Sequence, residues 1–277
     1  MVVVVFVTKA DGTRQRFDRE KVVKTCLSMG ATRRVAETIA EKIETRAHDG
    51  IESRKILQMI FRQLSSYHPS VKRRIDLRKA LSLMKSKPDF ERFIQAVLRE
   101  HGYEVVPNQI IRGKCVEHEV DAVARKDDVT YIVEVKHHFN YHALTGLDIS
   151  RIARAVFEDV TEGAKLGLND FTIDRAMIIC NTKFSEHAEL YARCRGIRQM
   201  GWNSPPDCNL RSMITKKKLY PVTYLRGLTT ATRGQLASAG IVLLQQLTAR
   251  DAKVLRRTTG LSKSTLDSLI DGARAIL

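Results

Sequence analysis

Two carboxylates and a lysine near the middle of the chain, Asp121, Glu134 and Lys136, have the types and spacing for chemistry on a phosphate. Side chains alternate along a β-strand, so Glu134 and Lys136 would lie on one face of a valine-rich strand while Val133 and Val135 lie on the other. Asp121 lies on the neighbouring predicted strand and can converge with Glu134 at the same edge. Paired carboxylates hold Mg²⁺ or Mn²⁺, which lowers the pKa of a bound water, and a lysine orients that water or balances the developing charge. The pattern therefore predicts metal-assisted hydrolysis of a phosphodiester bond.

A sheet with helices around it must position these side chains. Alternation of polar and apolar residues predicts the strands, and apolar residues at helical spacing predict the helices. The elements expected along the chain are a helix from Pro88 to Gly102, an extended stretch at 103–106, strands at 119–124 and 130–136, a helix near 149–162, a strand at 176–180 and a helix near 185–194. Helices that alternate with strands predict a mixed sheet covered by helices.

This pattern resembles the PD-(D/E)xK nuclease superfamily, and in particular the Mrr-type restriction endonuclease domain: a helix containing Glu91 is followed by Asp121 and then by Glu134-Val135-Lys136. The resemblance implies a restriction-endonuclease-like α/β core in which Glu91, Asp121, Glu134 and Lys136 are catalytic. It also implies a metal site formed by Asp121, Glu134 and Val135. The alternatives are an ordinary salt bridge for the acids and lysine of the hairpin, and an ordinary exposed position on an amphipathic helix for Glu91.

Histidines and arginines follow the hairpin. His138 and His142 are four residues apart but have no third ligand at a recognisable spacing, so the sequence does not favour zinc. His137, next to the end of the predicted strand, is instead expected to contact phosphate. Arg151 and Arg154 on the next helix could approach the DNA backbone, although a solvated helix face explains them equally well.

The first 86 residues predict a small α+β domain, a β-hairpin followed by a helical bundle. Val2 to Val7 and Arg14 to Phe17 pair around a turn at Ala10-Asp11-Gly12-Thr13, and Asp18 caps a helix that runs to Met29. Further helical patterns lie at 32–47, 53–66 and 70–84.

This arrangement resembles the ATP-cone, the nucleotide-sensing domain of ribonucleotide reductases and their repressor. The matching stretches are residues 7–12, 17–21 and 49–53. The resemblance implies that Lys9 and Lys21 contact the triphosphate of ATP or dATP, that Val7 lies beside the base, and that Ser53 stands where the family usually has a threonine. Ala10 departs from the family, which usually has a second basic residue there, so a scaffold kept only as a basic interaction module is the alternative.

The last segment, residues 219–277, contains two similar units, Gln235 to Ile241 and Leu255 to Leu261. Each ends a helix in a turn at Gly240 or Gly260, where glycine permits a left-handed backbone and N–H groups at the start of the next helix remain free to bind phosphate. The units resemble the tandem helix-hairpin-helix domain, an all-α module that binds DNA without reading its sequence. The alternative is a module for protein contacts. The DNA-binding residues that the resemblance implies are Gly240, Gly260, Lys263, Arg233, Arg256 and Arg257.

Charge favours a polyanionic partner for this chain of 277 residues, whose formal net charge is +16. Residues 1–87 hold 20 basic and 9 acidic residues, residues 88–212 hold 16 and 19, and residues 213–277 hold 11 and 3. Basic flanks fit nucleic acid, and an acidic middle fits a divalent metal. Five cysteines without a CxxC pair fit reduced thiols, and no apolar run is long enough for a membrane span, so we expect a cytoplasmic protein without a membrane partner.

The sequence thus predicts an α/β multidomain protein with domains at 1–86, 88–212 and 219–277. The predicted boundaries are a break between helices at Lys85–Pro88 and an irregular, basic connector from Trp202 to Lys218. We expect a metal-dependent DNA endonuclease regulated by ATP or dATP, and a homo-oligomer, with a dimer favoured for cutting both strands. The nucleotide would be an effector rather than a fuel because no GxxxxGK[ST] loop is present. Two alternatives remain: a non-catalytic, nucleotide-responsive DNA-binding regulator, and a structure-selective nuclease that acts on RNA or branched DNA.

Overall fold

The computed structural model describes residues 4–10, 12–67, 71 and 73–277. Its contacts divide the chain into two compact units, Met1–Ile75 with Arg274–Ile276 and Asp76–Ala273 with Leu277. The second unit therefore contains the predicted segment 88–212 and most of 219–277, and the division into three domains stays a prediction. Among the described residues, no helix is long and apolar enough to cross a membrane.

The first unit has the predicted hairpin and helical bundle. Its elements are β1 (Phe6–Thr8), β2 (Arg14–Arg16), α1 (Arg19–Ser28), α2 (Arg33–Glu44), β3 (Ile51–Glu52) and α3 (Ser53–Tyr67). Asp18 caps α1 as expected, since its carboxylate accepts hydrogen bonds from the backbone N–H groups of Glu20 and Lys21. β3, which was not predicted, pairs in parallel with β1 and completes a small sheet. Val2, Val3 and Asp11 of the predicted hairpin lie outside the described residues.

The helix predicted at 70–84 is shorter in the described part of the chain. Asp76 accepts a hydrogen bond from the backbone N–H of Lys79 and begins α5 (Leu77–Ser82). The apolar spacing continued across Asp76, but an aspartate with extended backbone angles at a helix start is a cap rather than an interior residue. Residues 70 and 72 of the predicted helix lie outside the described residues.

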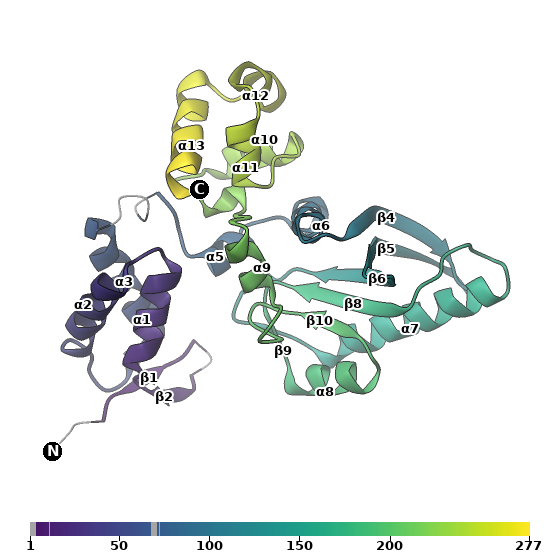
Figure 1. Ribbon diagram of the computed structural model, residues 1–277, viewed down its shortest axis with the longest axis horizontal. Helices are drawn as coiled ribbons and strands as arrows, with labels where there is room; N and C mark the ends of the chain where they lie inside the picture. The colour runs from purple at the N-terminus through teal and green to yellow at the C-terminus, as the bar shows by residue number, and fades with distance from the viewer. Residues whose placement is uncertain (1–3, 11, 68–70, 72) are drawn as a thin grey trace. The chain divides into compact units, whose positions relative to one another are not determined.

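The second unit is built on a five-stranded mixed sheet in the order β10-β8-β6-β5-β4 (Figure 1). β4, β5 and β6 are antiparallel neighbours joined by short connections, whereas β8 and β10 continue the sheet in parallel with β6 and need longer crossovers. The predicted hairpin and mixed sheet are confirmed. The strands are β4 (Glu104–Arg112), β5 (Glu117–Lys126), β6 (Val129–Lys136), β8 (Arg175–Cys180) and β10 (Arg198–Met200).

Three helices pack on this sheet: α6 (Glu91–Glu100), α7 (Leu147–Lys165) and α8 (Glu186–Cys194). α7 packs against β8 and α8, and the two helices enclose a core with strand residues such as Val123 and Ile132. α6 contacts β4 and β5, on the opposite side of the sheet from α7 (Figure 1). A separate two-stranded parallel ladder joins β7 (Leu144–Thr145) to β9 (Lys183–Phe184).

The connector after β10 is more regular than predicted. An irregular, basic segment was expected between Trp202 and Lys218, but it contains α9 (Leu210–Lys216), capped by Asn209. Leu210, Met213 and Ile214 are buried on one face of α9. The expectation was wrong here because the prolines at 205–206 and the three lysines at 216–218 indicated an irregular segment, whereas the residues between them form a short amphipathic helix.

The C-terminal region is helical. Gly240 and Gly260 both have a φ of 68°, in the left-handed region, as the two predicted turns require. Ser262 caps the last helix through the backbone N–H of Thr265. The elements are η2 (Val222–Tyr224), α10 (Thr230–Ser238), α11 (Leu244–Ala249), α12 (Ala252–Thr259) and α13 (Lys263–Ile276). The likeness to a tandem helix-hairpin-helix domain stays a prediction.

Candidate active site

Asp121 is fixed where the ladder between β5 and β6 ends. The last paired residues are Ala122 and Val133, and beyond them Asp121 Oδ2 accepts a hydrogen bond of 2.7 Å from the backbone N–H of Val135. Gln95 of α6 donates from Nε2 to the backbone oxygen of Asp121 at 3.0 Å. Asp121 is only 6% exposed. The residue is therefore held from both its side chain and its backbone, and its remaining carboxylate oxygen, Oδ1, pairs with Lys87 Nζ at 3.4 Å.

Glu134 and Lys136 alternate with buried valines on β6, as the sequence predicts. Val133 and Val135 are buried, whereas Glu134 and Lys136 are half-buried. Burial and, next in size, the negative charge of Asp121 raise the pKa of Glu134 to about 7 from its ordinary value of 4.5. The positive charges of Lys136 and Lys87 oppose this rise. The shift shows that Asp121 and Glu134 are close enough to repel each other.

Glu91, the first residue of α6, belongs to the same cluster. Its side chain is buried, although the sequence allowed an ordinary exposed position. Burial raises the pKa of Glu91, and the charge of Asp121 raises it further, while the positive charge of Lys87 lowers it. The structure thus brings Glu91, Asp121 and Glu134 into one electrostatically coupled group.

Lys87 completes the group and was missed in the sequence, where residues 85–88 were interpreted only as a break between helices. Its Nζ lies 3.4 Å from Glu91 Oε1, 3.4 Å from Asp121 Oδ1 and 3.2 Å from Glu119 Oε1. Burial lowers the pKa of Lys87, but the hydrogen bond to Glu119 and the charges of Asp121 and Glu91 outweigh it and raise the pKa overall. The spacing of four residues between Lys87 and Glu91 was the available signal.

The described residues contain no group of three or more histidines, cysteines, aspartates and glutamates already gathered for a metal ion. The acids of the cluster are arranged around an ammonium group instead. Their donor set still suits magnesium, because Mg²⁺ prefers carboxylate oxygens, needs only one or two of them and keeps several waters. The mutual repulsion of Asp121 and Glu134 is what a divalent cation would relieve.

His137 and His138 have structural partners. His137 is buried. Its Nδ1 contacts Ser86 Oγ at 3.1 Å, and its Nε2 contacts the backbone oxygen of Leu81 at 3.0 Å. Burial lowers its pKa, and both ring nitrogens are occupied, so this arrangement gives no support to the expected phosphate contact. His138 contacts Thr145 Oγ1 at 3.0 Å.

Arg151 and Arg154 both lie on α7, but they differ in their surroundings. Arg151 is exposed. Arg154 donates from Nε to Glu158 Oε1 at 2.6 Å, and its guanidinium lies over the ring of Phe157. Of the two, Arg151 is the one whose side chain is open to solvent.

In the first unit, two of the predicted nucleotide-binding residues lie at one end of the small sheet. β1 and β3 are parallel, with Val7 opposite Ile51, so Lys9 and Ser53 follow directly after two neighbouring strands. Val7 is buried in β1. Lys21 lies on α1, where its Nζ is 4.0 Å from Asp18 Oδ2.

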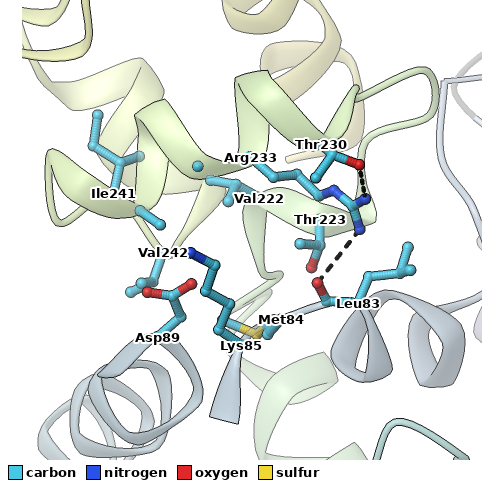
Figure 2. A pocket seen from close by; sticks show the side chains of 12 residues that line it. Leu83, Met84, Lys85, Asp89, Val222, Thr223, Thr230, Arg233, Ile241 and Val242 are labelled. Carbon is cyan, nitrogen blue, oxygen red and sulfur yellow. Dashed lines mark hydrogen bonds between the residues drawn. The ribbon is translucent and has the colours of Figure 1, made fainter. Parts of the chain in front are cut away.

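In the C-terminal region the predicted DNA-binding residues separate into two groups. Gly260, Lys263, Arg256 and Arg257 are exposed around the second glycine turn. Arg233 is instead directed inward. It lines a cavity of about 130 Å³ and donates to Thr230 Oγ1 at 3.0 Å and to the backbone oxygen of Leu83 at 3.4 Å (Figure 2).

Two known families match this chain. Residues 83–200 match the restriction endonuclease family of the Mrr catalytic type. Residues 220–277 match the C-terminal domain of the AF1548-like family. The first match contains the whole cluster of Lys87, Glu91, Asp121, Glu134 and Lys136, and the second contains both glycine turns.

Individual relatives come from the archaeon Archaeoglobus fulgidus. One uncharacterized protein is 35% identical over 181 residues, which cover 65% of this chain and 98% of the relative. A second is 45% identical over 38 residues, which cover 14% of this chain and 81% of the relative. The crystal structure of AF1548, described as a protein of unknown function, superposes with a TM-score of 0.57 at 35% identity and covers 66% of this chain and 94% of that one.

Proposed function

The chain belongs to the AF1548-like family and carries an Mrr-type restriction endonuclease domain, which implies a nuclease with DNA as its substrate; from this we propose that it is a metal-dependent DNA endonuclease. The observation that carries the proposal is the placement of Asp121, Glu134 and Lys136 at one strand edge inside that domain. A domain kept only for DNA binding would have no need of a carboxylate with a pKa near 7 beside a second carboxylate.

Asp121 and Glu134, with Val135, would hold Mg²⁺ or Mn²⁺. The bound ion would supply an activated water and offset charge on the scissile phosphate. Asp121 is held by the N–H of Val135 and so keeps one carboxylate oxygen in a fixed position. Lys136 places an ammonium group two residues from Glu134, where it orients the attacking water or balances negative charge. Glu91, buried beside Asp121, supports the position and charge of that carboxylate.

Purified protein incubated with plasmid DNA and Mg²⁺ or Mn²⁺ tests the activity directly. The parent should cut DNA, and Glu134→Gln and Lys136→Met should each reduce the rate by at least about a hundredfold. Glu117→Gln, an exposed glutamate on β5, is the matched control and should cut at the parent rate. Single-stranded, branched and RNA substrates in parallel reactions define the preference. Cutting by Lys136→Met at the parent rate would show that the assignment is wrong.

We further propose that the first unit binds ATP or dATP as an effector, through Lys9, Lys21, Val7 and Ser53. Lysine ammonium groups suit a triphosphate, and Lys9 and Ser53 follow neighbouring parallel strands. Binding of a fluorescent dATP analogue should weaken by about ten- to hundredfold in Lys9→Met and in Lys21→Met. Lys24→Met, an exposed lysine on α1, is the control. Equal binding by all four proteins would remove this part of the proposal.

The C-terminal region would bind the DNA backbone through Gly240 and Gly260 and the basic residues around them. Lys263, Arg256 and Arg257 are exposed there, as is Arg151 on α7, whereas Arg233 and Arg154 already have partners within the protein. We also propose that the protein acts in the cytoplasm. We propose a homodimer because one active site per chain cuts one strand at a time. Sedimentation velocity with and without duplex DNA measures the assembly.

A further inference from the structure

We propose that Lys87 is the resident cation of the acidic cluster when no metal is bound, and that a divalent metal must displace it. This inference rests on the proposed function. The Lys87 ammonium lies within 3.4 Å of carboxylate oxygens of Glu91 and Asp121 and within 3.2 Å of one of Glu119. These are the distances of ion pairs, so the lysine neutralises the charge that a metal would otherwise neutralise.

Burial explains why the cluster needs such a cation. The side chains of Glu91 and Asp121 are 4% and 7% exposed, and both approach the same ammonium group. Buried charges without a partner are strongly destabilising. Lys87 supplies the partner from the solvent side, where its own side chain is 60% exposed.

The same asymmetry allows the ammonium to leave. An exposed lysine stem can rotate into water without disturbing the core, whereas the two carboxylates cannot move without breaking buried contacts. The arrangement is therefore one of fixed anions and a removable cation. Because the described acids gather around Lys87, binding of the metal requires departure of the lysine.

The backbone of the lysine is anchored to the strand that carries the site. Ser86, the preceding residue, contacts His137 Nδ1, and His137 directly follows Lys136 at the end of β6. The ring of His137 also packs on Phe90, with ring centroids 4.9 Å apart. Lys87 thus stays attached beside the site when its ammonium leaves, and it returns as an internal competitor whenever the metal is absent.

Mn²⁺ binding, measured by calorimetry and by the paramagnetic signal of free Mn²⁺, tests the inference without reference to cleavage. Lys87→Met should bind Mn²⁺ about ten- to hundredfold more tightly than the parent, because hydrogen bonds to charged groups must be broken only in the parent. Lys87→Arg should keep the parent affinity within about threefold. Lys114→Met, which removes an exposed lysine paired with Glu162 in the same domain, corrects for the change in net charge and should bind like the parent.

Thermal unfolding provides the second readout. In EDTA, Lys87→Met should unfold at a lower temperature than the parent and Lys114→Met, and Mn²⁺ should raise its unfolding temperature by more than it raises that of the parent. Lys87→Ala repeats both measurements in case the methionine variant does not fold. If the parent binds Mn²⁺, Asp121→Asn does not, and Lys87→Met binds no more tightly than the parent, the competition is refuted while the metal site stands. If neither the parent nor Lys87→Met binds Mn²⁺, both proposals fail.

Discussion

Glu134 depends on its surroundings more than any other residue of the site. Its pKa is raised to about 7 by burial and by Asp121, so the folded protein holds a proton there that the unfolded chain releases near pH 4.5. The folded state therefore binds more protons than the unfolded state between pH 4.5 and about 7. Across this window the free energy of unfolding falls as the pH rises.

Glu134→Gln should abolish this pH dependence. A shift from 4.5 to about 7 corresponds to at most about 3 kcal/mol, at about 1.36 kcal/mol per pH unit. In EDTA at pH 8, Glu134→Gln should be more stable than the parent by up to that amount, and near pH 4.5 the two should differ little. Urea unfolding at several pH values measures the difference, with Glu117→Gln as the control. Parallel stability profiles for Glu134→Gln and the parent would contradict the assignment.

Metal binding should release a proton in the same pH range. A carboxylate must be ionised to bind the ion, so below pH 7 the metal replaces the proton of Glu134. Calorimetry of Mg²⁺ or Mn²⁺ binding in two buffers of different ionisation enthalpy should give about one proton per ion at pH 5.5 and close to none at pH 8.5. The same proton release at both pH values would show that Glu134 is not a ligand.

Four members of the site, Glu91 among them, could be predicted from the sequence, but the fifth, Lys87, could not. Asp121, Glu134 and Lys136 carry a recognisable pattern because strand alternation fixes which side chains share a face. Lys87 has only its spacing of four residues from Glu91, and its role depends on how the segment Ser86–Phe90 leads into α6 and places the lysine beside Glu91. The partners of His137 are likewise tertiary contacts, with Ser86 and Leu81, that no local spacing encodes.

At the scale of elements, the sequence predicted those strands and helices that local residue patterns determine. The β5–β6 hairpin follows from alternating residues and from a turn in which Asp127 and Asp128 accept positive φ angles of 50° and 59°. β3 could not be predicted, because two residues form a strand only by pairing with β1. α9 was missed because its short apolar face lies between proline and lysine runs. Whether such short elements form depends on tertiary contacts rather than on the intrinsic helix or strand propensity of their residues.

Packing of α7 against the β4–β5 connection depends on Gly163. A Cβ at this position would lie 2.8 Å from the backbone oxygen of Arg112 and 2.9 Å from the backbone nitrogen of Lys114. Gly163→Ala should therefore lower the free energy of unfolding by about 1 to 3 kcal/mol, although alanine favours helices. Gly234→Ala in α10, where nothing lies within 4 Å, is the matched control and should stabilise by about 0.5 to 1 kcal/mol. Urea unfolding separates the two, and a stabilised Gly163→Ala would contradict the close approach.

At the scale of the whole molecule, acidic and basic residues are concentrated in different segments of the chain. Residues 88–212, which contain the site, hold 16 basic and 19 acidic residues, while residues 213–277 carry 11 basic and 3 acidic residues. Exposed Lys263, Arg256 and Arg257 lie around one glycine turn. Such an arrangement favours contacts with phosphates that depend on salt and not on base sequence.

Replacing Arg256, Arg257 and Lys263 together by glutamine should weaken DNA binding to all sequences alike. Each lost phosphate contact should reduce the slope of log K against log salt by about 0.9, so the triple variant should lose up to about 2.7. Fluorescence anisotropy with two unrelated duplexes at several salt concentrations measures the slopes. The triple replacement of exposed Arg193, Arg195 and Lys183 in the nuclease region is the control for net charge. An unchanged slope would place the DNA contacts elsewhere.

The combination of antiparallel and parallel strands in the sheet has a consequence for how the chain folds during synthesis. Every proposed site residue from Lys87 to Lys136 lies on η1 (Ser86–Phe90), α6 or the antiparallel strands β4 to β6, which are neighbours in sequence as well as in space. Local pairings form early, whereas β8 and β10 must wait for the crossover helices α7 and α8. On the ribosome, the acids and their lysine can thus meet while the nascent chain is still incomplete. Water is excluded from β6, which carries Glu134, only when β8 pairs beside it.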